Sequence, residues 1–383
     1  MIKQGNGIIN KLRSQYRLLS AFYQILIQIQ IPVSMSYSKH FICLQFSLLL
    51  TFMLFLQSAS AQYNFGEVDQ LIEQRKALFG GNLVALAWQN DKIIYQKAIG
   101  DLTINSQESM AAASNWFTAA LVMTFVDQGK LSLDAPVARY LPIFAQYAKS
   151  YLTIRHCLSN TTGLEGTKTG LPGILKKNKF ASLEEEVNAY ASKREIVNNP
   201  GLEFTYNNIG SNIAGRVLEI VGKKSFDRLM LERIFRPLGM KKSSFTSETA
   251  VDPAGGARST PSDYLRFLAM LLNKGSLNGK RILSEEAVAE MQKIQTNGAK
   301  TIFVPKAANG FSYGLGEWIQ ESDDKGNSTI VSSPGLSGTW PYIDKCRNYA
   351  CIIFEKNQGK ESKRDPYLEI KEAIESVLPN GCK

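Results

Sequence analysis

The order of strand-like and helical segments along the chain constrains its fold more than any other feature. Two strand-like runs, residues 82–88 and 92–98, follow a predicted helix over 66–78 and are joined by a polar turn at 89–91. From about residue 110 the apolar residues keep a helical period, and strand signals return only from residue 314. This order predicts an α/β (α+β) fold, in which an antiparallel sheet built from both chain ends is flanked by terminal helices and interrupted by an all-α insertion.

The same pattern divides the chain into two parts. Residues 62–109 and 300–383 are expected to form the α/β part, and residues 110–299 the mainly helical part. The first helix of the helical part runs through 119–126 and stops near Gly129. The remaining predicted elements are helices over 183–191, 208–221, 225–234, 261–272 and 285–291, strands over 314–320, 329–332, 339–343 and 349–355, and a last helix over 366–377.

The N-terminal region has the features of an export signal. Sixteen uncharged residues, 41–56, follow Lys39 and His40 and end before Ala59-Ser60-Ala61, an A-x-A-type cleavage site. Residues 35–61 are therefore predicted to be a signal peptide cleaved after Ala61, with residues 1–34 an upstream extension. The alternative is a membrane anchor, because residues 18–37 are also uncharged, but glutamines and Pro32 interrupt that stretch. We expect an exported protein, periplasmic or secreted, with no stable membrane anchor after cleavage.

Half of the formal charge of +10 lies in this leader. The first 61 residues hold five Lys or Arg and no acidic residue, which leaves 39 basic against 34 acidic residues in the remainder. That remainder contains no run rich in Lys or Arg. The charge therefore argues against a nucleic-acid partner.

Four cysteines remain after the leader, namely Cys157, Cys346, Cys351 and Cys382. They allow three pairings; a cross-strand bridge between Cys346 and Cys351 in a predicted hairpin and free thiols both fit. The one remaining histidine, His156, lies in an apolar helical stretch and is interpreted as structural, which excludes a zinc site built on histidines. No Walker loop, dinucleotide fingerprint or H-E-x-x-H occurs, so no metal and no cofactor are expected.

An ordered set of motifs spans most of the region after the leader. It begins with Ala-Ala-Ala-Ser-Asn-Trp-Phe-Thr at 111–118. The set resembles the serine β-lactamase-related family, which comprises class C β-lactamases, DD-peptidases and the esterases similar to them. The later members, in the family's order, are Thr153-Ile154-Arg155-His156 with Thr162-Gly163, Pro200-Gly201 with Phe204-Thr205-Tyr206-Asn207-Asn208, Pro237-Leu238-Gly239-Met240, Gly255-Gly256, Ser259-Thr260 with Asp263, and Tyr313-Gly314-Leu315-Gly316.

The resemblance implies a three-part catalytic site. A serine at the start of a helix attacks an acyl group, and a lysine three residues later lies beside it on the same helix face. A Tyr-x-Asn loop supplies a phenol that relays the proton. A strand with Lys-Thr-Gly or His-x-Gly lines the other wall, and the backbone N–H after its glycine helps to form an oxyanion hole.

This chain departs from that pattern at its two most diagnostic positions. Alignment on Trp116 places Ala112 at the nucleophile position and Asn115 at the lysine position. Alanine carries no nucleophile, and an amide is not a useful base at neutral pH. Ser114 is the alternative nucleophile, but it lies about 200° round the helix from Ala112, so a packing or capping role is favoured. The Ser-x-x-Lys string from Ser322 falls in an acidic turn and is interpreted as chance.

Of the other two parts of the family's site, the Tyr-x-Asn loop is retained and the strand is altered. Tyr206 is the predicted proton relay and Asn208 a polar substrate contact, with a buried structural tyrosine as the alternative. Ser333 stands where the family often has Lys or His, and Gly335 remains, so that the backbone N–H of Leu336 is a predicted oxyanion donor. Asn160 stands where many relatives carry histidine.

These observations lead to two main hypotheses. In the first, the chain is an exported β-lactamase-related serine hydrolase homologue that binds a small-molecule or peptide ligand in its cleft but lacks acyl-transfer activity. In the second, it hydrolyses β-lactams, peptides or esters through a relocated nucleophile, or is an inactivated variant of an active parent. A third reading, an exported binding protein whose cleft has no role, predicts no affinity for the family's ligands.

Overall fold

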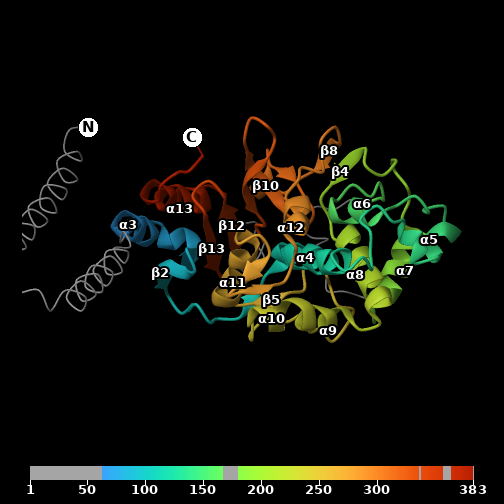
Figure 1. Cartoon of the computed structure of the whole chain (residues 1–383), viewed down its shortest axis with the longest axis horizontal. Coiled ribbons are helices and arrows are strands. Elements are labelled where there is room, and N and C mark those ends of the chain that lie inside the picture. Colours follow the sequence, from blue (N-terminus) through green and yellow to red (C-terminus); the bar gives the residue numbers. More distant parts are fainter. Residues whose placement is uncertain (1–62, 167–179, 336–337, 357–363, 383) are drawn as a thin grey trace, which may run out of the picture. The chain divides into compact units, whose positions relative to one another are not determined.

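A seven-stranded antiparallel sheet joins the two ends of the chain (Figure 1). The computed structural model describes residues 63–166, 180–335, 338–356 and 364–382. The strand order is β2-β1-β13-β12-β11-β10-β9, so that the N-terminal hairpin pairs directly with the last strand, from Leu83 opposite Glu355 to Trp88 opposite Ala350. The strands are β1 (Leu83–Gln89), β2 (Lys92–Ile99), β9 (Ser312–Tyr313), β10 (Trp318–Ser322), β11 (Ser328–Ser332), β12 (Thr339–Asp344) and β13 (Tyr349–Glu355). The predicted sheet built from both chain ends is confirmed.

The first hairpin turns through two residues in the left-handed conformation. Gln89 pairs with Lys92, and Asn90 and Asp91 have φ angles of 50° and 60°. Two consecutive positive φ angles match a type I′ turn, whose twist suits a two-residue hairpin and which favours Asn and Asp. The polar turn seen in the sequence therefore sets the register of β1 against β2.

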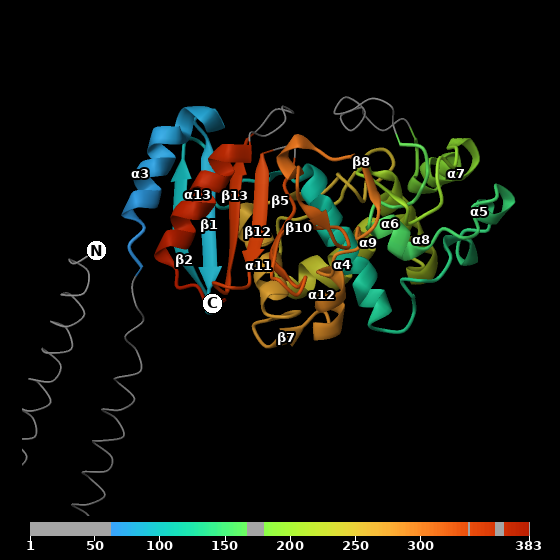
Figure 2. The ribbon, with the colours of Figure 1, turned by 90° about the horizontal axis from the view of Figure 1, so that it is seen from above.

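Both faces of the sheet are covered, which explains the uninterrupted apolar character of β1. Leu83, Ala85 and Ala87 pack on one face with residues of α3 (Gly66–Arg75) and α13 (Arg364–Val377). Val84 and Leu86 point to the opposite face, into the main core. Figure 2 shows the two terminal helices beside the strands that come from the chain ends. The predicted flanking helices are thus confirmed.

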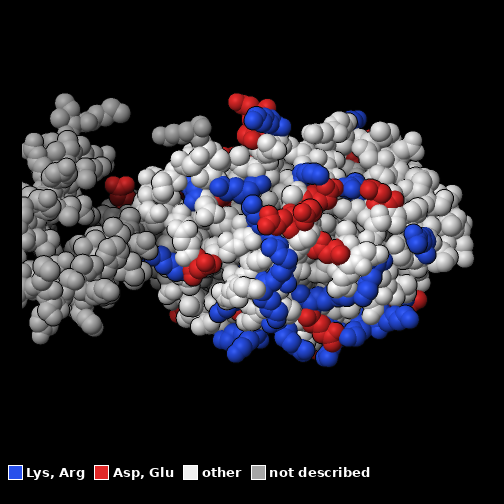
Figure 3. All heavy atoms as spheres, in the orientation of Figure 1, with Lys and Arg blue, Asp and Glu red and all other residues white. Residues whose placement is uncertain are grey.

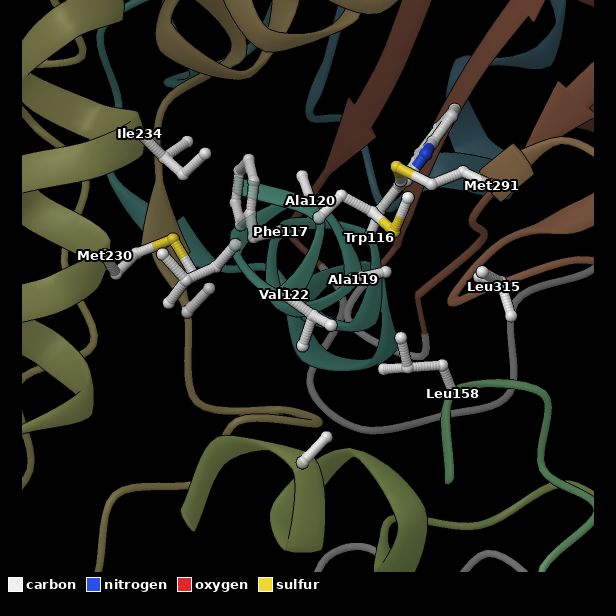
Figure 4. Close-up of a cluster of buried hydrophobic side chains, with 14 of the residues drawn as sticks. Trp116, Phe117, Ala119, Ala120, Val122, Leu158, Met230, Ile234, Met291 and Leu315 are labelled. Atoms are coloured by element: carbon white, nitrogen blue, oxygen red, sulfur yellow. The ribbon is translucent and has the colours of Figure 1, made fainter. Parts of the chain in front are cut away.

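Helix α4 (Ser114–Val126) runs through the middle of the main core. Every residue from Ser114 to Phe125 is buried. A helix that is apolar on all sides must be enclosed on all sides. Figure 4 shows Phe117 directed toward Met230 and Ile234, whereas Trp116 lies toward Met291 on the other side of the helix. The core therefore continues from the sheet through α4 into the helical part.

The insertion is mainly helical, but short paired strands lie within it and at its two borders with the α/β part. The pairs are β3 (Glu108–Ser109) with β5 (Arg258–Ser259), β4 (Glu203–Thr205) with β8 (Lys300–Phe303), and β6 (Ser276–Leu277) with β7 (Lys280–Arg281). Two of these ribbons join segments far apart in the sequence, so no local pattern indicated them. The helices are α5 (Ile143–Gln146), α6 (Ile154–Leu158), α7 (Leu183–Lys193), α8 (Ile209–Gly222), α9 (Phe226–Met230), α10 (Arg236–Leu238), α11 (Pro261–Leu272) and α12 (Glu285–Met291).

The cysteines pair differently from the local bridge considered from the sequence. Cys346, in the β12–β13 turn, forms a disulfide with Cys382 near the C-terminus, and Cys157 and Cys351 are free and buried. Cys351 lies within β13 opposite Ala87 and belongs to the core between the sheet and the terminal helices. Its side chain therefore points into the core, and Cys346 pairs with Cys382 instead.

The predicted leader, residues 1–61, lies outside the described residues. Within the part of the chain that is described, no helix combines the length and the apolar character needed to cross a membrane.

We predict that the Cys346–Cys382 bond contributes about 2–4 kcal/mol to the free energy of unfolding, because it closes a loop of 36 residues in the unfolded chain. Replacing both cysteines by serine should lower the urea midpoint by the corresponding amount. Dithiothreitol should lower the wild-type midpoint and leave the double variant unchanged. Labelling of the Cys346 and Cys382 peptides by iodoacetamide in denatured, unreduced protein would contradict the bond.

Candidate active site

The chain makes a sharp bend where it enters α4. The N–H of Met110 donates to the carbonyl of Ala257 at 2.8 Å, and Ala111 then adopts a φ of 43°. A positive φ is strained for alanine and costs of the order of 1 kcal/mol. A 3₁₀ turn over Ala111–Ala113 leads into the helix. The bend presents Ala112, half-buried, at the N-terminus of α4, where a helix favours negative charge.

Asn115 lies one turn further on, and both polar atoms of its side-chain amide form hydrogen bonds. Its Nδ2 donates to the carbonyl of Ala112 at 3.0 Å and to Tyr206 Oη at 3.2 Å. Ser211 Oγ, on α8, donates to Asn115 Oδ1 at 2.6 Å. The amide is buried and bridges three elements, so both of its polar atoms are satisfied. The residue predicted to occupy the lysine position is therefore an uncharged amide that links Ala112, Tyr206 and Ser211.

Tyr206 is brought to this bridge by the loop before α8. Its backbone N–H donates to the carbonyl of Phe303, and its ring packs 4.9 Å from that of Trp318, centroid to centroid. Burial raises the pKa of the Tyr206 phenol far above its usual range, and the donors Asn115 and Trp318 only partly offset this effect. The phenol therefore remains protonated at neutral pH.

Asn160 holds the Tyr206 loop in place. It has a φ of 56°, its carbonyl accepts the N–H of Thr205 at 3.0 Å, and its Oδ1 accepts the N–H of Asn207 at 3.1 Å. Asn tolerates the left-handed conformation better than most residues do. Asn208 directly precedes α8 and is half-buried.

The segment after β11 approaches the start of α4. A Cβ on Gly335 would lie 2.5 Å from the carbonyl oxygen of Met110, so only glycine allows this close approach. The N–H of Gly335 donates to the carbonyl of Thr339, and Ser333 is almost fully buried. The structure therefore brings Gly335 beside the bend that carries Ala112. Leu336 lies outside the described residues.

The remaining sequence candidates have structural contacts. Ser114 Oγ accepts the N–H of Ala257 at 3.0 Å in the core, which agrees with the packing role favoured for it. His156 forms a capping box with Thr153 at the start of α6, and burial lowers its pKa. Ser322 ends β10, and the N–H of Lys325 donates to Asp323 Oδ1 in an exposed turn. Among the residues that the structure describes, no cluster of three or more His, Cys, Asp or Glu could hold a metal ion.

A buried carboxyl group, Glu317, lies behind α4 and was missed from the sequence. The preceding Gly316 has a φ of 75°, and a Cβ there would lie 2.6 Å from the carbonyl oxygen of Asn115. Glu317 has no exposed surface, and neither of its oxygens has a hydrogen-bond partner among the described residues. Burial raises its pKa to about 8, although Lys345 and the Trp116 indole act in the opposite direction. One acidic residue between Gly316 and Trp318 was the only signal in the sequence.

Ser211 was also missed, although its position carried a signal. It lies three residues after Asn208 on a helix whose neighbouring positions are buried and mostly apolar. A polar side chain in such a place usually has a buried partner, here Asn115.

Comparison with known proteins places the chain in a family. The model of the family described as Beta-lactamase matches residues 68–374. D-alanyl-D-alanine-carboxypeptidase/endopeptidase AmpH of Escherichia coli (strain K12) is 23% identical over 280 residues, covering 67% of this chain and 70% of the relative.

Two solved structures have the same fold. A candidate β-lactamase from Bacteroides dorei DSM 17855 superposes with a TM-score of 0.74 at 29% identity, covering 82% of this chain and 99% of that one. D-amino acid amidase from Ochrobactrum anthropi SV3 has a TM-score of 0.63 at 19% identity, covering 81% and 97%. The fold is that of the penicillin-binding proteins and β-lactamases. The chain belongs to the β-lactamase family, a family of hydrolases with varied substrates.

We predict that Glu317 makes the protein less stable as the pH rises. Its carboxyl stays protonated in the folded state up to about pH 8, whereas in the unfolded chain it ionises near 4.5. The stabilising contribution is therefore complete below about pH 4.5 and is lost as the pH approaches 8, by up to about 1.4 kcal/mol per pH unit. Urea unfolding between pH 5 and 8.5 measures this slope.

The variant Glu317→Gln should flatten that slope, because an amide cannot ionise. Glu372→Gln, at an exposed position on α13, is the matched control and should keep the wild-type slope. Equal slopes in the wild type and Glu317→Gln would contradict the assignment.

Proposed function

We propose that this chain is an exported member of the β-lactamase family that binds an acyl compound or peptide in its cleft and does not form an acyl-enzyme. The observation that carries the proposal is the pair Ala112 and Asn115. The first position has no nucleophilic atom, and the second is occupied by an amide whose two polar atoms are already bonded. Nucleophile and base are therefore absent together.

The state of Tyr206 supports the same conclusion. A phenol acts as a proton relay when a neighbouring cation lowers its pKa. Its partner here is the neutral amide of Asn115, and burial raises the phenol pKa. We therefore assign Tyr206 a hydrogen bond to Asn115 and no proton transfer.

Several features support retention of the cleft itself. The strained bend at Ala111 persists although no nucleophile needs to be presented, and Gly335 still packs against Met110. We assign Asn208 and Ser333 to polar ligand contacts and the N–H of Leu336 to an oxyanion-type contact. The relatives named as a D-alanyl-D-alanine peptidase and a D-amino acid amidase point to a ligand with a D-amino-acid amide or peptide bond.

Export is supported by two independent features. One is the apolar leader that ends in Ala59-Ser60-Ala61. The other is the disulfide between Cys346 and Cys382, because such bonds form and persist in oxidising compartments. Together they favour a periplasmic or secreted protein that begins at Gln62.

We expect no covalent adduct when the protein is incubated with a fluorescent penicillin or a fluorophosphonate and its intact mass is measured. Loss of a nucleophile that acts together with its base costs about 10⁶ in rate. A stable adduct on any serine would show a relocated nucleophile and overturn the proposal. Ligand binding without reaction is measured separately, by calorimetry with a D-alanyl-D-alanine peptide.

The double change Ala112→Ser with Asn115→Lys should restore acylation by the penicillin. A lysine at 115 would lie within reach of Tyr206 Oη and Ser211 Oγ, the two hydroxyls that now contact the amide. Ala112→Ser alone and Asn115→Lys alone are the controls, and each should remain unreactive because nucleophile and base act as a unit. If the folded double variant still does not react, further catalytic groups are missing at Ser333 and Asn160. The hypothesis that the rest of the site is intact would then be wrong.

A further inference from the structure

Positive charge is concentrated in one segment of the folded chain. Residues 223–281 contain twelve Lys or Arg and five Asp or Glu, a surplus of seven positive charges. The other described residues hold 20 basic and 28 acidic side chains, a surplus of eight negative charges. The modest net charge thus conceals a strong asymmetry between this segment and the other described residues.

The fold gathers five of these cations, which we call the basic face: Arg236, Lys241, Lys242, Arg258 and Arg266. All five are exposed, and none forms an ion pair with another described residue. Figure 3 shows Lys and Arg along the edge of the molecule where Figure 1 places α9, α10 and β5.

Specific contacts connect the members of the basic face. Gln107 Nε2 donates to the carbonyl of Lys242 at 2.8 Å, and Arg258 Nη2 donates to the carbonyl of Gln107 at 3.2 Å. Arg266 Nη1 would lie 3.8 Å from a Cβ on Gly239, in the turn that precedes Lys241. Residues from α10, β5 and α11 therefore converge on one turn.

A buried carboxylate fixes that turn. Asp263 Oδ2 accepts the N–H of Lys242 at 2.7 Å and the hydroxyl of Ser243 at 3.0 Å. The Asp263 carboxylate is thus directed inward, and the exposed side chains of Lys241 and Lys242 form no ion pair with a described residue. The backbone that carries the two lysines is therefore held in one conformation.

We propose that the basic face binds the surface of a bilayer that contains anionic phospholipids. A bilayer presents many phosphate groups in a plane, and each nearby Lys or Arg strengthens adsorption about fivefold. The exposed large apolar residues of the described chain all lie outside 223–281. The face therefore offers no aromatic platform for unpaired bases.

The test is flotation of the full chain with vesicles of phosphatidylcholine alone or with 30% phosphatidylglycerol. The wild type should bind anionic vesicles more strongly than neutral ones, and 0.5 M salt should remove the difference. The variant K241Q/K242Q/R266Q should lower the partition constant for anionic vesicles about 100-fold. Thermal unfolding checks that it is folded.

The matched control is K92Q/K130Q/K300Q, which removes the same charge from exposed positions outside the basic face. It should bind anionic vesicles within about twofold of the wild type, because salt screens the attraction between the vesicle and charges that lie away from the contact. The proposal is overturned by equal losses in the two triple variants, by equal binding of neutral and anionic vesicles, or by tighter binding of a 30-base-pair DNA duplex at the same salt. None of these readouts depends on the cleft.

Discussion

The complete burial of α4 is the constraint on which the rest of the structure depends. Trp116 and Phe117 point to opposite sides of the helix, and each requires apolar partners from a different part of the chain. The sheet and the helical insertion must therefore close around one helix. Because the same helix begins at the strained bend of Ala111, the packing of the core also determines where position 112 is presented. The core and the candidate site therefore both depend on α4.

Because α4 belongs to both the core and the candidate site, the side chain at position 115 must also satisfy the packing and hydrogen bonding of the core. Position 115 is buried among Tyr206, Ser211 and the Ala112 carbonyl. A lysine there would place a charge in a desolvated site, which is costly unless it is compensated. An asparagine fills the same hydrogen-bonding positions without a charge. A neutral side chain at position 115 therefore avoids the desolvation cost that a lysine would bring.

Sequence patterns predicted most of the regular elements because their causes are local. Pro261, placed directly after a capping Thr260, marks the start of α11, and the structure gives Pro261–Leu272 as predicted. The predicted helix over 225–234 instead changes to a π-helical turn at Leu231–Phe235, where Phe117 and Phe245 pack against Phe235. Pairings such as Glu203 with Lys300 depend on residues about a hundred positions apart, and no local pattern indicates them.

The sequence by itself determined the fold class and the family resemblance, and it led to the prediction that Ala112 and Asn115 occupy the nucleophile and lysine positions, because periodicity, turn chemistry and motif order are properties of neighbouring residues. Only the tertiary structure decided which cysteines bond, what Asn115 contacts, that Glu317 is buried without a hydrogen-bond partner among the described residues, and that Arg236, Arg258 and Arg266 share one surface. Each of these depends on the distance between side chains that are remote along the chain. That distance is set by how the core closes around α4.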